Sequence, residues 1–132
     1  MKYIVLDTSF LMALSELRFL NLGDLTRFYP NARLITTKSV VKELKGFLRG
    51  KRKAAASVAL QVIEKHNVVV DERYCGEADE DIIALAKELG AAVATFDLEL
   101  KERLLEGGIP VVYLRAGKKL VLDDPLRLSK ES

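Results

Sequence analysis

Four acidic residues of this chain stand where carboxylates could do chemistry: Asp7, Glu43, Asp79 and Asp97. Asp7 closes the apolar run 3–6, and Asp97 closes the apolar run 91–96. Carboxylates that converge repel one another, and a bound cation relieves the repulsion. Mg²⁺ and Mn²⁺ prefer oxygen ligands, and such ions activate water for attack on a phosphodiester. The four acids therefore predict metal-assisted hydrolysis of a phosphate ester.

Strand and helix patterns alternate along the segments that must position these acids. Short apolar runs predict strands at 3–6, 33–36, 68–70, 91–96 and 110–114, with an antiparallel edge strand at 120–122. Apolar residues at helical spacing predict helices at 10–17, 21–29, 40–48, 51–66, 77–89 and 98–106. This alternation predicts an α/β fold, a three-layer α/β/α sandwich around a mostly parallel five-stranded sheet. Sites in such sheets lie beyond the carboxyl ends of the strands, where all four acids can project.

Each acid taken alone also has a purely structural explanation. Acids in the first turn of a helix interact well with the helix dipole, which would account for Asp79, Glu80 and Asp81. An Asp that follows a strand is often a turn former or a helix cap, and Thr8 and Ser9 are further candidate caps. The joint placement of the four acids favours a site over these separate explanations.

Length and composition place the chain among globular proteins. With 132 residues, 49% hydrophobic and 30% charged, it fits one domain, which we expect over 1–125, with a frayed tail over 126–132. Cys75 is its single cysteine, so no intrachain disulfide can form. The first apolar run is too short for a signal peptide or a membrane span. We therefore expect a cytoplasmic protein without a membrane partner.

Several segments, in order, resemble the motifs of PIN domains. Residues 5–11 resemble the opening motif, and 40–44, which contain Glu43, resemble the second-acid segment. Residues 78–86 resemble the third-acid helix, 93–97 the fourth-acid strand, and 108–112 the final strand. The resemblance covers nearly the whole chain. It implies a PIN-like fold and a magnesium- or manganese-dependent endoribonuclease that cuts single-stranded RNA.

The resemblance also implies a role for each site residue. Asp7, Asp79 and Asp97 would hold the metal directly or through water, and Glu43 would bind metal or position the attacking water. Ser9 and Thr95 would be supporting hydroxyls near the acids. Glu99 matches a position where some PIN domains carry a further acid.

The choice of the third acid depends on register, because Asp79 and Asp81 are both acidic. The family pattern counted back from 84–86 selects Asp79. Asp81, two residues on, points about 200° away around a helix, so the two cannot share a face. We expect Asp81 either to face solvent or to support the site from behind.

A basic segment surrounds Glu43 in the sequence. Between residues 38 and 53, Glu43 is the only acid, and the predicted RNA-binding residues are Lys42, Lys45, Arg49, Lys51, Arg52 and Lys53. Such a patch would attract a phosphate backbone and bring RNA beside the metal. A solvated helix face, or a surface for an acidic protein partner, remains an alternative.

The resemblance leaves the biological role open. Many small prokaryotic PIN proteins are VapC-type toxins restrained by an antitoxin, and we place that role first. Alternatives are a PIN nuclease of ribosomal RNA maturation and a non-catalytic PIN domain that binds RNA or protein. PIN relatives often form homodimers, and the largely apolar stretch 10–22 is the surface that we expect for one.

Overall fold

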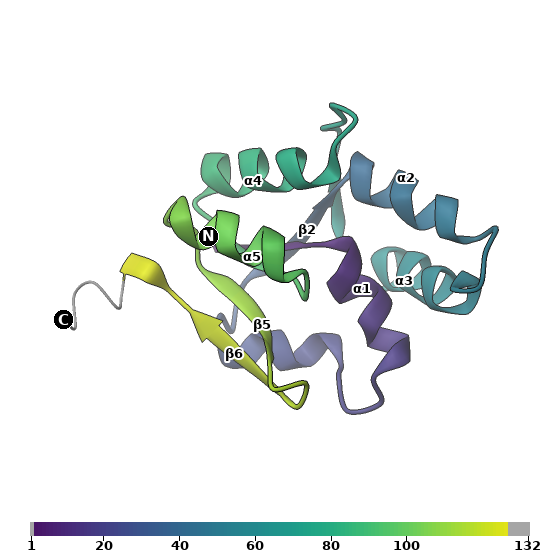
Figure 1. The fold of residues 1–132 in the computed structure, drawn as a ribbon, viewed down its shortest axis with the longest axis horizontal. Helices are drawn as coiled ribbons and strands as arrows, with labels where there is room; N and C mark the ends of the chain where they lie inside the picture. The colour runs from purple at the N-terminus through teal and green to yellow at the C-terminus, as the bar shows by residue number, and fades with distance from the viewer. Residues whose placement is uncertain (1, 127–132) are drawn as a thin grey trace.

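A six-stranded sheet forms the centre of the protein, and helices flank it (Figure 1). The computed structural model describes residues 2–126. Its strands are β1 (Tyr3–Leu6), β2 (Arg33–Thr37), β3 (Val69–Asp71), β4 (Ala92–Ala94), β5 (Val111–Arg115) and β6 (Lys119–Asp123). Its helices are α1 (Thr8–Glu16), the short 3₁₀ helix η1 (Leu22–Arg27), α2 (Lys38–Phe47), α3 (Lys53–Lys65), α4 (Ala78–Leu89) and α5 (Leu98–Glu106). The expected three-layer α/β/α class is confirmed.

The order of the strands reverses at the middle of the sheet. The order is β3-β2-β1-β4-β5-β6, and every neighbouring pair is parallel except β5 with β6. From β1 the chain moves outward to β3 and then crosses back to place β4 on the other side of β1. At such a reversal the following connections leave in opposite directions, which opens a crevice at the carboxyl ends of β1 and β4.

The sixth strand of the sheet is the antiparallel edge strand predicted at 120–122, added to the expected five-stranded sheet. Residues 119–123 pair along their full length with β5, from Arg115 opposite Lys119 to Val111 opposite Asp123. The turn between them contains two consecutive residues with positive φ, Ala116 at 53° and Gly117 at 67°. A tight turn of this kind directs the chain back along the strand it has left, and so completes an antiparallel edge.

The core lies on both faces of the two central strands. Every residue of β4 and residues 4–6 of β1 are at most 1% exposed, which explains why these strands are continuous apolar runs in the sequence. Helices α1 and α3 pack on each other, while α4 packs on β1, β2 and β4. Burial on both sides fixes the ends of β1 and β4 in place.

Part of the stretch 10–22, where a dimer surface is expected, is buried: residues 10–13 and 20 lie in the core. Phe10, Leu11 and Met12 are at most 1% exposed because α1 buries them in the core. Phe19 is the large apolar side chain of the stretch that is clearly exposed, at 52%. The apolar pattern reports a core helix here.

Two further expectations concern the segment 21–29 and the ends of the chain. Within residues 21–29, where a helix is predicted, the structure has the shorter 3₁₀ helix η1 (Leu22–Arg27), which begins with a capping box between Asn21 and Asp24. The frayed tail expected at 126–132 lies, apart from Leu126, outside the described residues. Over residues 2–126, every helix lacks the length and apolar character that crossing a membrane requires.

Candidate active site

A pocket of about 350 Å³ at the carboxyl edge of the sheet brings the four predicted acids together. Asp7 follows β1, Glu43 lies in the middle of α2, Asp79 lies in the first turn of α4, and Asp97 caps α5. The pocket is lined by Asp7, Thr8, Ser9, Met12, Glu43, Phe47, Arg52, Asp79 and Asp97. The β1 and β4 connections that carry Asp7 and Asp97 are those that diverge where the strand order reverses.

Asp7 is fixed by hydrogen bonds to one of its two carboxylate oxygens. The Ser9 hydroxyl donates to Oδ2 at 2.8 Å, and the Thr95 hydroxyl donates to the same oxygen at 2.7 Å. Asp7 is 4% exposed and Thr95 is fully buried, so this arrangement is enclosed by protein. Among residues 2–126, no hydrogen bond reaches Oδ1. One carboxylate oxygen therefore orients the side chain and the other is available to a ligand.

In Asp97, too, one carboxylate oxygen accepts hydrogen bonds and the other is available to a ligand. Its Oδ1 accepts the backbone N–H groups of Glu99 at 3.0 Å and Leu100 at 3.1 Å, which caps α5. Its own N–H donates to the Thr95 hydroxyl at 3.1 Å. Strand β4 ends at Ala94, so Asp97 lies beyond a short connection and not at the strand end as expected. Thr95 thus links the first and fourth acids.

Ser9 completes the connection between the β1 and β4 edges. Its Oγ accepts the backbone N–H of Phe96 at 2.9 Å and lies 3.1 Å from the Thr95 hydroxyl oxygen. These contacts place both predicted supporting hydroxyls against the first acid. The expectation that Thr8 or Ser9 caps α1 is wrong, because Asp7 occupies the N-cap position and receives no side-chain cap bond.

The pocket changes the protonation of Asp79. Burial, together with the carboxylates of Asp7 and Asp97, raises the pKa of Asp79 to about 6. Arg103 on α5 opposes the rise, and Glu43 makes a smaller contribution to it. Carboxylates that raise the pKa of a neighbour act on the same small region of space. Glu43 and Asp97 are the exposed members of this group.

The donor atoms in the pocket suit a hard divalent cation. Among the described residues, no three ligating side chains are close enough to enclose an ion on their own. Mg²⁺, however, keeps several water ligands and takes one or two carboxylates from a protein. Within 2–126, hydrogen bonds leave free Oδ1 of Asp7, Oδ2 of Asp97 and both oxygens of Asp79. The Thr8 Oγ1, which the sequence did not single out for the site, is also buried there without a partner. The residues fit an ion held partly through water.

Asp81 is buried, at 3% exposure, so the alternative that it faces solvent is wrong. Its Oδ2 accepts hydrogen bonds from the Ser39 hydroxyl and, at 3.0 Å, from the backbone N–H of Cys75. Burial alone would raise the pKa of Asp81, but these hydrogen bonds outweigh it and hold the pKa below its ordinary value. Asp79 and Asp81 therefore point to different surroundings, as their helical spacing requires. Asp81 joins the start of α2, which carries Glu43, to α4, which carries Asp79.

Replacing Asp81 by Ala is expected to lower the free energy of unfolding by about 2–3 kcal/mol, because the buried Ser39 hydroxyl and the partly buried N–H of Cys75 lose their acceptor. Urea denaturation would measure this. Glu77→Ala is the matched control, since Glu77 is exposed and its side chain makes no capping bond. Equal stability of the two variants would contradict an anchoring role for Asp81.

The predicted RNA-binding residues are all exposed, but they differ in their relation to the pocket. Of these, Arg52 alone lines the acid pocket, among the residues described. Lys42 lies over the ring of Tyr74, with Nζ 4.8 Å from the ring centroid. Lys45, Arg49, Lys51 and Lys53 lie on the outer surface of α2, the following turn and the start of α3. Glu99 is exposed on α5 and does not line the pocket.

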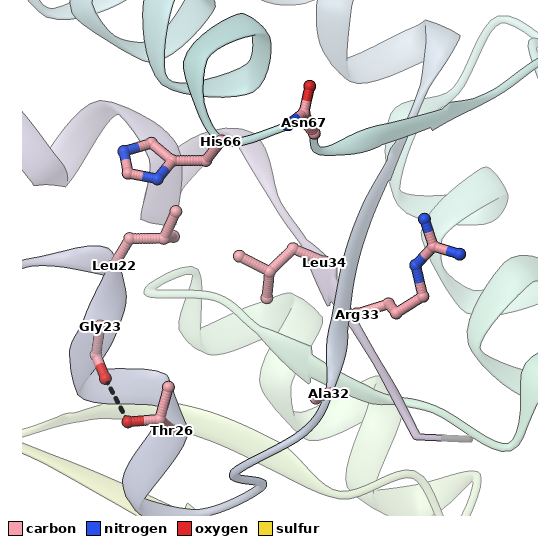
Figure 2. A pocket seen from close by; sticks show the side chains of 8 residues that line it. All are labelled: Leu22, Gly23, Thr26, Ala32, Arg33, Leu34, His66 and Asn67. Atoms are coloured by element: carbon pink, nitrogen blue, oxygen red, sulfur yellow. Dashed lines mark hydrogen bonds between the residues drawn. The ribbon is translucent and has the colours of Figure 1, made fainter.

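Another hollow, of about 440 Å³, lies at the amino end of the sheet. Figure 2 shows Arg33 and Leu34 at the start of β2 on one side, with His66 and Asn67 after α3 above them. It is lined by Leu22, Gly23, Thr26, Ala32, Arg33, Leu34, His66 and Asn67. Although it is the larger of the two, its lining includes no carboxylate. This hollow therefore offers no carboxylate ligand for a metal ion, whereas the acid pocket does.

The fold and the pocket define an α/β protein with converging carboxylates at the reversal point of its sheet. A family profile described as "PIN like domain" matches residues 4–117. The chain therefore belongs to the PIN-like domain family.

Two curated relatives are similar in sequence. "Ribonuclease VapC9" of Archaeoglobus fulgidus is 36% identical over 125 residues, covering 90% of this chain and 87% of the relative. "Ribonuclease VapC4" of Methanocaldococcus jannaschii is 43% identical over 72 residues, covering 54% of this chain and 53% of the relative.

Solved structures share the fold at lower sequence identity. The PIN domain endonuclease Utp24 superposes with a TM-score of 0.74 at 22% identity, covering 92% of this chain and 91% of that one. A chain of VapBC-1 from nontypeable Haemophilus influenzae superposes with a TM-score of 0.58 at 18% identity, covering 85% and 96%. At these identities, the superpositions support the shared fold.

Proposed function

We propose that this protein is a metal-dependent endoribonuclease that hydrolyses phosphodiester bonds of single-stranded RNA, acting as a VapC-type toxin. The observation that carries the proposal is the pocket in which Asp7, Glu43, Asp79 and Asp97 converge. The relative named Ribonuclease VapC9 supports the choice of RNA, because it matches 90% of this chain at 36% identity.

Each acid takes a distinct part in the proposed reaction. Asp7, Asp79 and Asp97 would hold Mg²⁺ or Mn²⁺, through the oxygens that no hydrogen bond occupies within 2–126. When bound, such an ion activates water and stabilises charge on the phosphate. Ser9 and Thr95 keep Asp7 in one orientation, which preserves the geometry between turnovers. Glu43, at the exposed side, would position the attacking water or add a ligand.

The exposed cations on α2 and the start of α3 would guide the RNA strand toward this pocket. The segment that carries Glu43 also carries six exposed basic residues: Lys42, Lys45, Arg49, Lys51, Arg52 and Lys53. Opposite charge on a phosphate backbone gives affinity that falls as salt rises. In the toxin role, an antitoxin protein would restrain the activity. A nuclease of ribosomal RNA maturation would use the same residues on a different substrate.

Removal of divalent metal is expected to abolish cleavage. The purified protein would be incubated with end-labelled random-sequence RNA and with total RNA, in Mg²⁺ or Mn²⁺, and parallel samples would contain EDTA. We expect internal cuts in single-stranded RNA with metal and at least roughly 100-fold less product with EDTA. Single-stranded DNA and duplex RNA serve as substrate controls. Equal cleavage with and without EDTA, or no cleavage of any RNA, would contradict the proposal.

A further inference from the structure

The acid pocket contains one basic side chain among the residues that line it, and that side chain is held by an acid outside the pocket. Arg52, at the N-cap of α3, donates from Nη2 to Oε1 of Glu16 at 2.6 Å and from Nε to Oε2 at 3.1 Å. Glu16 is the last residue of α1. The guanidinium also lies 5.5 Å from the ring centroid of Phe47, at the end of α2.

This arrangement keeps Arg52 away from the carboxylates it would otherwise neutralise. Within residues 2–126, its ion pair is with Glu16, and none joins it to Asp7, Glu43, Asp79 or Asp97. The cation that opposes the rise in the Asp79 pKa is Arg103, on a different helix. Arg52 is therefore not the counterion of the acids, although it shares their pocket.

The two hydrogen bonds to Glu16 leave part of the guanidinium available. A guanidinium has five N–H donors, and Glu16 uses the Nε edge. The Nη1 group takes part in no hydrogen bond within the described chain. The remaining Nη1/Nη2 edge has the fork geometry that binds a phosphate through two parallel hydrogen bonds.

A purely structural role explains this arrangement less well. The Arg52 and Glu16 side chains are 47% and 40% exposed, and exposed ion pairs contribute little to stability. A pocket of four carboxylates, by contrast, repels an RNA strand, and a basic side chain at its wall would lessen that repulsion in addition to a bound metal ion. Glu16 holds one edge of the Arg52 guanidinium, and Phe47 lies against it. Because the side chain is already fixed in one rotamer, it loses little further conformational entropy when it binds RNA.

We propose that Arg52 binds a backbone phosphate of the RNA strand beside the scissile bond, and that Glu16 is the positioning residue that aims it. The inference rests on the proposed function and deepens it, because it separates Arg52 from the other surface cations. Those cations attract RNA by charge, while Arg52 contacts the strand inside the pocket.

The test measures RNA binding and cleavage separately. Binding of a fluorescent single-stranded RNA is followed by anisotropy in the Asp7→Asn background, over a range of salt, for Arg52→Ala, Arg52→Lys, Glu16→Gln and the double variant Glu16→Gln/Arg52→Ala. Steady-state cleavage is measured for the same substitutions with Asp7 intact. Arg33→Ala is the matched control, since it removes one exposed arginine at the opposite end of the sheet (Figure 2).

We expect Arg52→Ala to weaken RNA binding at least roughly 10-fold, the range of a lost charge-assisted contact. The slope of log affinity against log salt should fall by about 0.7, the value of one phosphate contact on a single strand. Arg52→Lys should keep the slope but recover only part of the affinity, because a lysine lacks the fork. Glu16→Gln should cause a smaller loss, with no further loss when combined with Arg52→Ala.

Other outcomes would overturn the inference in distinguishable ways. A wild-type protein that cleaves RNA, with Arg52→Ala binding RNA as well as Arg33→Ala does, would sink this inference alone. Equal losses from Arg52→Ala and Glu16→Gln with an unchanged salt slope would indicate a structural ion pair. A wild-type protein that neither binds nor cleaves RNA would sink the proposed function, and this inference with it.

Discussion

Replacing Asp7 by Asn is expected to reduce RNA cleavage on the order of 100- to 1,000-fold while the protein stays folded. The amide oxygen of Asn can take the place of Oδ2 and accept the same hydrogen bonds from Ser9 and Thr95. The amide nitrogen then replaces Oδ1, which no donor reaches within 2–126. The substitution thus removes a ligand oxygen and a negative charge, and it leaves the hydroxyl contacts in place.

The measurement compares initial rates on single-stranded RNA in Mn²⁺ with unfolding midpoints in urea. Asp123→Asn is the control, because it removes one carboxylate from β6, at the edge of the sheet and outside the pocket lining. We expect the control to cleave like the wild type. Retained cleavage in the Asp7→Asn variant would show that Asp7 is not part of the active site. Lost cleavage with a collapsed unfolding midpoint would show instead that Asp7 acts through stability.

The framework of this site follows from the sequence because its signals are local. The run 3–6 is buried as β1 and ends before Asp7, and α5 begins and ends where its helical spacing predicts. Strand and helix alternation implies that the carboxyl ends of parallel strands share an edge, and this is enough to place Asp7 and Asp97 together. The match of 78–86 to the family pattern put Asp79 ahead of Asp81, and the pocket contains Asp79.

The partners of these acids could not be predicted in the same way, because they depend on contacts between distant segments. Asp81 is buried against Ser39, and helical periodicity gives the direction of a side chain but not what it meets. Arg52 stood in a run of similar cations, and its pairing with Glu16 depends on how α1 packs on α3. The buried Thr8 hydroxyl resembled a helix cap, and only the tertiary fold leaves it unpartnered in the pocket.

Asp79 links the chemistry of the pocket to the stability of the fold. The shift of its pKa determines whether stability rises or falls with pH. Its pKa is raised from 3.8 to about 6, so between these values the folded protein binds a proton that the unfolded chain has released. The contribution of Asp79 to the free energy of unfolding therefore falls as pH rises from 3.8 to about 6, and the loss is complete above the pKa of the folded state. A neutral side chain at position 79 would avoid the loss.

Replacing Asp79 by Asn is therefore expected to abolish cleavage and yet to stabilise the metal-free protein at neutral pH. We expect cleavage to fall on the order of 100-fold or more. We expect the free energy of unfolding in EDTA at pH 7 to rise by about 1 kcal/mol, a value discounted for the partial exposure of the side chain. The gain should shrink as pH falls toward 3.8, because below that value the wild-type carboxyl is protonated in both the folded and the unfolded state.

Urea denaturation between pH 4.5 and 7.5, with Glu77→Gln as a control for removing an exposed acid nearby, would measure this dependence. Addition of Mn²⁺ supplies a second readout. An ion that binds only the folded state stabilises the wild type as its concentration rises above the dissociation constant. The Asp79→Asn variant should lose most of that stabilisation, because it lacks a ligand. A variant that is less stable than the wild type in EDTA at pH 7, or that gains as much from Mn²⁺, would contradict the placement of Asp79 among the ligands. We thus expect one substitution, Asp79→Asn, to stabilise the metal-free protein and to abolish cleavage in the presence of metal. A carboxylate that binds a cation would give this pair of results, whereas a carboxylate that stabilises the fold would not.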